Sequence, residues 1–270
     1  MASTPDFGRS LCLGVDTKGY GSADNITQAE WQRALLECLD LAAAWAKIDR
    51  IPWRKQSNGD GELALLPDDG IEPRVVDDFV RELDRALADY NRGQAAHQRL
   101  RLRLALHHGV AYPGANGTPG QAVVEVSRLV NSKPAHEALE AVPEAHLAVI
   151  LSALIYEDVV LQRHTSLRPT DFCRVQVVEK EFTADAWLRV PGVDVRRLDL
   201  PSMRGTPHVD QQGTASDYST VAQAGSNLVQ RTDRQGMVIH QDAGTAYNFN
   251  QVDAPFSHFG PVNEGRGHHD

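Results

Sequence analysis

The chain has 270 residues, of which 41% are hydrophobic and 23% charged, a balance typical of a soluble globular protein. Its formal net charge of -9 argues against non-specific binding to nucleic acid or to an acidic membrane surface, because both favour a basic chain. We expect no membrane-spanning segment, since the apolar stretches are short or interrupted. Cys12, Cys38 and Cys173 are far apart and form no Cys-x-x-Cys pair, so we interpret them as reduced, buried thiols of a cytoplasmic protein.

The first half of the chain alternates between strand and helix patterns. The apolar run at residues 10–15 predicts a short buried strand. Thr27 and Glu30 have the spacing of a capping box, and the apolar residues after them recur at helical spacing. Residues 58–61, Asn-Gly-Asp-Gly, predict the tight turn of a β-hairpin whose second strand is 62–66.

The same alternation continues to about residue 190. Residues 76–90 have the pattern of a second amphipathic helix. In residues 100–107 leucines alternate with Arg, Ala or His, which predicts a half-buried strand. The remaining predicted elements are a helix at 121–131, a strand at 145–151, a short helix at 152–159 and a closing strand pair at 174–178 and 184–190. This order favours an α/β sandwich, in which helices pack on a sheet.

The composition changes after Pro191-Gly192. We expect one domain at 1–192 and a polar, flexible tail at 193–270, because the tail is rich in Gly, Gln, Asn and Ser and its apolar residues show no long period. Short β-prone islands at 221–226 and 238–240 faintly resemble the amyloid-like signalling motifs at the ends of some bacterial immune-type proteins. A tail of that kind would bind a protein partner.

Two acidic residues carry the chemistry that the sequence suggests. Asp16 follows the first predicted strand within a glycine-rich segment, and Asp60 stands in the predicted hairpin turn. If the hairpin lies beside the first strand, both carboxylates reach one point. Carboxylates and nucleotide phosphates together hold Mg²⁺ or Mn²⁺, which take oxygen ligands. Turn chemistry alone is an alternative explanation for Asp60.

Four motifs in this order resemble the class III adenylyl/guanylyl (nucleotidyl) cyclase catalytic domain. They are the hydrophobic-Asp-x-x-Gly-aromatic segment around Asp16, the Gly-Asp of the hairpin, the Leu-Arg-Leu-Ala-Leu-His-His-Gly segment ending at Gly109, and residues 120–129. The resemblance covers residues 10–190. It implies a ferredoxin-like βαββαβ core with C-terminal additions, and a head-to-tail homodimer with sites at the interface. It also implies conversion of a nucleoside triphosphate into a cyclic mononucleotide and pyrophosphate. GGDEF-type domains share this core, but the chain has no Gly-Gly-Asp-Glu-Phe.

The resemblance also assigns site residues. It makes Asp16 and Asp60 the metal ligands and Arg128 the catalytic arginine that stabilises the transition-state phosphate, usually from the partner protomer. Lys180 matches a second phosphate cation. The nucleotide-binding candidates are Gly19, Tyr20, Lys55 and Gln56. The alternative for Arg128 is a surface helix arginine, and for Lys180 a solvated residue at a strand end.

Two positions depart from the family pattern. Val124 stands where an asparagine normally orients the ribose, and Gln56 stands where a lysine normally reads the base, with Lys55 beside it. Loss of an orienting contact slows chemistry that depends on aligned atoms. His107 and His108 are adjacent on one strand and point to opposite faces, so we expect structural roles rather than joint metal binding.

Three functions remain open from the sequence. The first is an active, Mg²⁺- or Mn²⁺-dependent cyclase working as a homodimer. The second is a cyclase-like pseudoenzyme that senses a nucleotide, which Val124 and Gln56 favour. The third is an assembly protein whose tail captures a partner. No sequence feature identifies the base, the product or the upstream signal.

Overall fold

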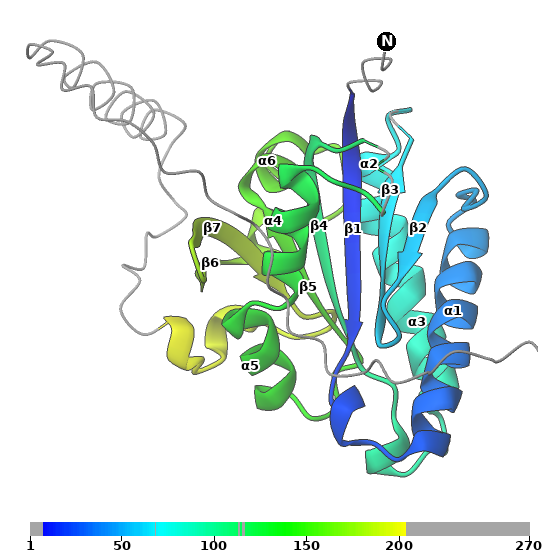
Figure 1. Ribbon diagram of the computed structural model, residues 1–270. Helices are drawn as coiled ribbons and strands as arrows, with labels where there is room; N and C mark the ends of the chain where they lie inside the picture. The colour runs from blue at the N-terminus through cyan, green and yellow to red at the C-terminus, as the bar shows by residue number, and fades with distance from the viewer. Residues whose placement is uncertain (1–7, 68, 113, 115–116, 204–270) are drawn as a thin grey trace, which may run out of the picture. The chain divides into compact units, whose positions relative to one another are not determined.

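A computed structural model describes residues 8–67, 69–112, 114 and 117–203 of the chain (Figure 1). Its centre is a seven-stranded sheet with the order β2-β3-β1-β4-β5-β7-β6. The strands are β1 (Arg9–Thr17), β2 (Arg54–Ser57), β3 (Gly61–Leu66), β4 (Leu102–Val110), β5 (Leu147–Ser152), β6 (Cys173–Glu179) and β7 (Phe182–Arg189). The central strand is β4; β1 runs antiparallel to both of its neighbours, β3 and β4, and β4 and β5 are the parallel pair.

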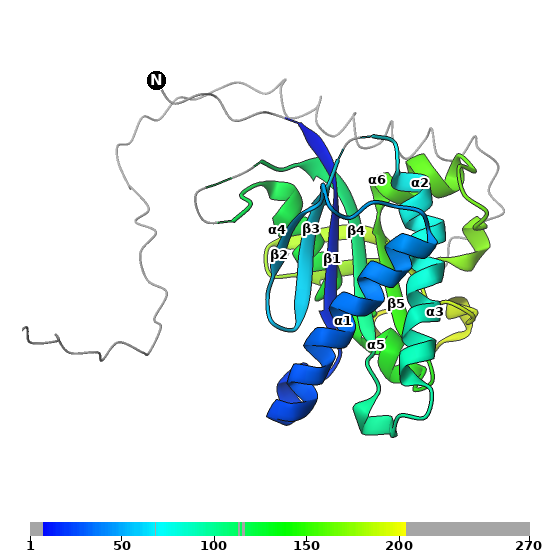
Figure 2. The same ribbon diagram turned by 90° about the vertical axis from the view of Figure 1, so that its right-hand side faces the viewer.

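Helices cover both faces of the sheet, as the predicted α/β sandwich requires (Figure 2). One face carries α1 (Asn25–Trp45), α2 (Glu72–Arg74), α3 (Val80–Asn91) and α6 (Ala153–Ile155). The other carries α4 (Gln121–Val130) and α5 (Lys133–Ala141). The 3₁₀ turns are Tyr20–Ser22, Ala96–Gln98, Pro169–Asp171, Val195–Arg197 and Pro201–Met203. The order of predicted strands and helices is confirmed, with α5 as an addition.

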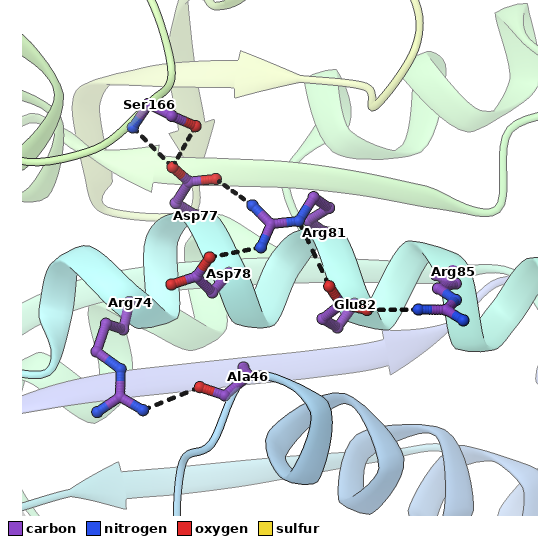
Figure 3. Close-up of polar contacts among 8 residues, drawn as sticks. All are labelled: Ala46, Arg74, Asp77, Asp78, Arg81, Glu82, Arg85 and Ser166. Carbon is purple, nitrogen blue, oxygen red and sulfur yellow. Dashed lines mark hydrogen bonds and ion pairs between the residues drawn. The ribbon is translucent and has the colours of Figure 1, made fainter.

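Two π-helical segments, Val75–Phe79 and Tyr156–Leu161, interrupt the regular helices on the first face. The first places Asp77 against the loop that follows the second (Figure 3). There the Ser166 backbone N–H and hydroxyl donate to Asp77 Oδ2 at 2.7 and 2.6 Å, while Arg81 donates to its other oxygen. This charged cluster holds together two segments that are far apart in sequence.

The start of α1 differs from the predicted capping box. The helix begins at Asn25, and the carboxylate of Asp24 accepts hydrogen bonds from the backbone N–H groups of Ile26 and Thr27 at 3.0 and 2.9 Å. Thr27 is therefore already inside the first turn, where its side chain is buried. Asp is as good an N-cap residue as Thr, and it comes first in the chain.

The prediction that the strand ending at His107 is half-buried is wrong. β4 lies between β1 and β5 with helices on both faces, so its polar side chains are buried as well. Arg103 is only 5% exposed and His107 only 6%. A buried arginine needs a charged partner, which makes Arg103 a candidate functional residue.

The predicted tail range starts inside the packed part of the molecule. Val195 and Leu200 are each 1% exposed and belong to the core on the α4–α5 face. The rest of the tail, with its two β-prone islands, lies outside the described residues, so the domain division stays a prediction. The three cysteines are buried and free, as predicted.

Candidate functional site

The two acidic residues singled out from the sequence lie at adjoining strand ends. Asp16 stands near the end of β1, opposite Gly61 of β3, and Asp60 is the turn residue just before that glycine. The Thr17 N–H donates to the carbonyl oxygen of Asp60 at 2.9 Å, which ties the strand end to the turn. The structure thus brings Asp16 and Asp60 together, while their metal-binding role stays a prediction.

Glycine is required where the hairpin meets β1. A Cβ atom on Gly61 would lie 2.1 Å from the carbonyl oxygen of Val15, far inside van der Waals contact. Gly59 has a φ of +83°, a conformation that side chains rarely adopt. The Asn-Gly-Asp-Gly sequence therefore forms the turn and also permits the close approach that places Asp60 beside Asp16.

Arg103 completes this site, and sequence reasoning missed it. It lies opposite Asp16 on β4, and its guanidinium donates a hydrogen bond to Asp16 Oδ2. Burial raises the pKa of Asp16, the ion pair with Arg103 opposes that rise, and the charge on Asp60 adds to it. The available signal was an arginine within an apolar strand, but the alternating pattern assigned it to a solvent face.

Two more basic groups lie near Arg103. His136 of α5 places Nδ1 at 3.4 Å from Arg103 Nη1, and burial together with the arginine charge lowers the pKa of His136. The Lys18 ammonium donates to the Leu139 carbonyl oxygen at 3.4 Å, and burial lowers the pKa of Lys18. The acidic pair at the end of β1 therefore lies beside Arg103, and His136 and Lys18 lie near that arginine.

The segment after Asp16 presents free backbone amides. Gly19 has a φ of +77° and starts a 3₁₀ turn, in which the Tyr20 hydroxyl accepts a hydrogen bond from Gln32 at 2.7 Å. The amides of Gly19, Tyr20 and Gly21 donate to no described residue. Successive free amides of this kind form a concave donor for an anion such as a phosphate.

Arg128 and Val124 share the outer face of α4. Ala122, Val126 and Leu129 turn toward the sheet, which leaves Val124 44% exposed and Arg128 half-buried one turn later. Arg128 makes no hydrogen bond or ion pair with any described residue, so its guanidinium is available to another molecule.

Lys55, Gln56 and Lys180 make no hydrogen bond or ion pair with Asp16. Lys55 and Gln56 are exposed on the edge strand β2, where Gln56 lies close to the loop glycine Gly117. Lys180 is exposed in the turn between β6 and β7, and β4, β5 and β7 separate β6 from β1. No contact among the described residues joins Lys180 to either aspartate.

His107 and His108 face opposite sides of the sheet, as predicted. His107 Nε2 lies 3.3 Å from Glu125 Oε2 of α4, whereas His108 Nε2 lies 3.8 Å from Glu72 Oε1 of α2. Neither histidine contacts Asp16 or Asp60, so the pair is not part of this site.

The donor set fits a divalent cation that arrives with a phosphate ligand. Among the described residues, no group of three or more His, Cys, Asp or Glu side chains could hold a metal ion. Asp16 and Asp60 supply two carboxylates, one of which also holds Arg103. Mg²⁺ is commonly bound by one or two carboxylates plus substrate phosphates and water, and this site offers that arrangement.

No protein-family model and no curated protein matches the chain. Among solved structures, it is similar to the adenylate/guanylate cyclase/hydrolase from Silicibacter pomeroyi, with 18% identity over 70% of this chain and 99% of that one, at a TM-score of 0.51. The guanylyl cyclase Cya2 is 16% identical, with 73% and 98% of the two chains covered and a TM-score of 0.48. The guanylate cyclase domain of RhGC from Catenaria anguillulae, solved with GTP, is 13% identical, with 67% and 95% covered and a TM-score of 0.44. On the first of these likenesses, the chain has the fold of a nucleotidyl cyclase catalytic domain.

Proposed function

We propose that the protein is a nucleotidyl cyclase-like signalling protein that binds a nucleoside triphosphate at Asp16, Asp60 and Arg103 and converts it to a cyclic mononucleotide and pyrophosphate. The observation that carries this proposal is the meeting of two carboxylates and a buried arginine at one end of β1. The backbone amides of residues 19–21, which have no partner among the described residues, follow directly after this end of β1.

In this reaction the ribose 3′-oxygen attacks the α-phosphorus, and the bond from that phosphorus to the β-phosphate bridging oxygen breaks. The 3′-hydroxyl proton passes to solvent and pyrophosphate leaves. The amides at 19–21 would donate to phosphate oxygens, and Arg103 would add charge-assisted donors. A divalent cation bound through Asp16 and Asp60 would supply further neutralisation of the phosphate charge.

A homodimer would complete the site. Arg128 has no partner within the described residues, and the sheet separates Lys180 from β1. A head-to-tail second copy would supply both cations across the interface, as the family resemblance implies. The single chain alone would then bind a triphosphate without the charges that Arg128 and Lys180 add in the transition state.

A second candidate is a nucleotide sensor that does not turn its ligand over. Val124 is 44% exposed on the face of α4 that carries Arg128, one turn away, and its side chain cannot hydrogen-bond a ribose. Binding would then change assembly, and the polar tail would capture a protein partner.

The cellular setting of either function is also a proposal. Among the described helices, none is both long and apolar enough to cross a membrane. The net charge of -9 agrees with the proposal of a cytoplasmic protein whose ligand is a nucleotide rather than nucleic acid.

The experiment offers each of the four common nucleoside triphosphates with Mg²⁺ or Mn²⁺, and measures binding and cyclic product separately. A cyclase gives product in the native protein and loses it in Asp60→Asn. If the protein is a sensor, it binds a triphosphate but forms no cyclic product. Val124→Asn should then raise the rate of product formation above that of the native protein. Val178→Asn is the matched control, because Val178 is an exposed valine on β6. Absence of both binding and product with every triphosphate contradicts both candidates.

A further inference from the structure

The guanidinium of Arg103 is held from two sides. Asp16 accepts a hydrogen bond from Nη2, and His136 Nδ1 lies 3.4 Å from Nη1. Arg103 is 5% exposed, so bulk water cannot readily replace either partner. Its Nε atom is buried and has no hydrogen-bond partner among the described residues. The orientation of the group therefore depends on these two contacts.

The position of His136 is fixed by the anchoring of α5, which lies at the end of the sheet where β1 ends (Figures 1 and 2). Arg101 donates to the carbonyl oxygens of Leu139 and Val142, each at 2.6 Å, and to that of Ala145 at 2.8 Å. These bonds join the C-terminal end of α5 to the residue that precedes β4. These bonds fix the position of α5 relative to β4, and with it the position of His136 relative to Arg103.

The contact also defines the hydrogen-bonding state of the imidazole. A guanidinium only donates, so Nδ1 of His136 must accept and Nε2 must carry the proton of a neutral ring. Burial and the charge of Arg103 lower the pKa of His136, and the charges of Asp16, Glu140 and Glu179 oppose this. A neutral ring at neutral pH agrees with the acceptor role that the geometry requires.

We propose that His136 is a positioning residue of the triphosphate site, where it holds Arg103 in place for the phosphate oxygens. This inference rests on the proposed function. When a cation and a triphosphate engage Asp16, that carboxylate is no longer free to orient the arginine. His136 is the remaining contact, and a donor that is already oriented loses less conformational freedom on binding.

The test compares His136→Ala with His136→Asn. The Asn side-chain oxygen stands near the place of Nδ1 and still accepts from Arg103, whereas Ala offers no acceptor. Titration with a fluorescent nucleoside triphosphate and competition with inorganic tripolyphosphate should show about a tenfold loss of affinity in the Ala variant. The Asn variant should recover most of that loss. His164→Ala, at an exposed histidine, is the control.

Two results separate this inference from the proposed function. If the native protein binds triphosphate and the Ala variant binds it equally well, the positioning role is wrong while the function stands. If the native protein binds no triphosphate, the function fails. The ¹⁵N resonances of the ring then decide the remaining structural claim. We expect His136 in the Nε2–H form with Nδ1 accepting a hydrogen bond, and a shift of the Nδ1 resonance in Arg103→Met, where that bond is lost. An unchanged Nδ1 resonance in Arg103→Met overturns the claim.

Discussion

Two histidines, the buried His107 and the half-buried His136, make stability depend on pH. Burial lowers the pKa of His107 below its ordinary 6.5, with Glu125 opposing the shift, and burial and Arg103 lower that of His136. Below 6.5 the unfolded chain therefore binds more protons than the native one, until the native residues titrate as well. The two histidines therefore lower the free energy of unfolding as the pH drops through this window.

We expect the urea midpoint to fall as the pH is lowered from about 7.5 to 5.5. The free energy of unfolding should then decrease with a limiting slope of about 1.4 kcal/mol per pH unit for each histidine. His107→Gln keeps a donor for Glu125 but does not titrate, so its midpoints should fall less steeply. An equal slope in the variant and the native protein would show that His107 is not a source of the effect.

The sequence predicts some residues of the site and not others, for physical reasons. Asp16 and Asp60 could be singled out because each stands beside glycine at the end of an apolar run. Arg103 and His136 could not, since their importance depends on contacts between β1, β4 and α5. Period-two alternation also assigns Arg103 to solvent unless the covering helix is known.

Among the elements, the hairpin can pack against β1 only because Gly61 has no side chain. A methyl group there would lie 2.1 Å from the Val15 carbonyl oxygen, so Gly61→Ala must push β3 away from β1. We expect a loss of about 1–3 kcal/mol in the free energy of unfolding, measured by urea denaturation. Gly8→Ala is the control, because a Cβ there meets no atom within 4 Å. Equal stability of the two variants would argue against the described register.

The N-cap of α1 gives a second test of an element. Asp24→Ala removes the acceptor for the amides of Ile26 and Thr27, so the thermal midpoint should fall. Glu30→Ala removes the other half of the capping box expected from sequence, and we expect no comparable loss. A larger effect at Glu30 would restore the capping-box interpretation.

Element order could be predicted because hydrophobic periods of two and 3.6 residues mark strands and helices. The start of α1 was misjudged because Asp24 and Thr27 are both good cap residues, and only the structure shows which one accepts. The burial of both faces of β4 depends on where α4 packs, and no local pattern in the sequence indicates that position.

At the scale of the whole molecule, the proposed dimer predicts complementation. Asp16→Ala and Arg128→Ala should each be inactive, because each lacks one half of every shared site. In an equal mixture that exchanges protomers, half of the dimers are mixed and carry one intact site, so about a quarter of the native rate should return. A mixture as inactive as its parts, despite exchange shown by labelled protomers, would contradict a site shared in this way.

Under the proposed function, the carboxylate pair on this cyclase fold converts a nucleoside triphosphate by ring closure. The most direct measurement follows cyclic mononucleotide and pyrophosphate together, for the native protein and Asp60→Asn, with each common triphosphate and Mg²⁺ or Mn²⁺. We predict equal amounts of the two products from at least one triphosphate, and at least a hundredfold lower rate in the variant, of the order seen when a charge-stabilising group is removed. Triphosphate bound without either product, or pyrophosphate released without a cyclic nucleotide, would contradict the claim.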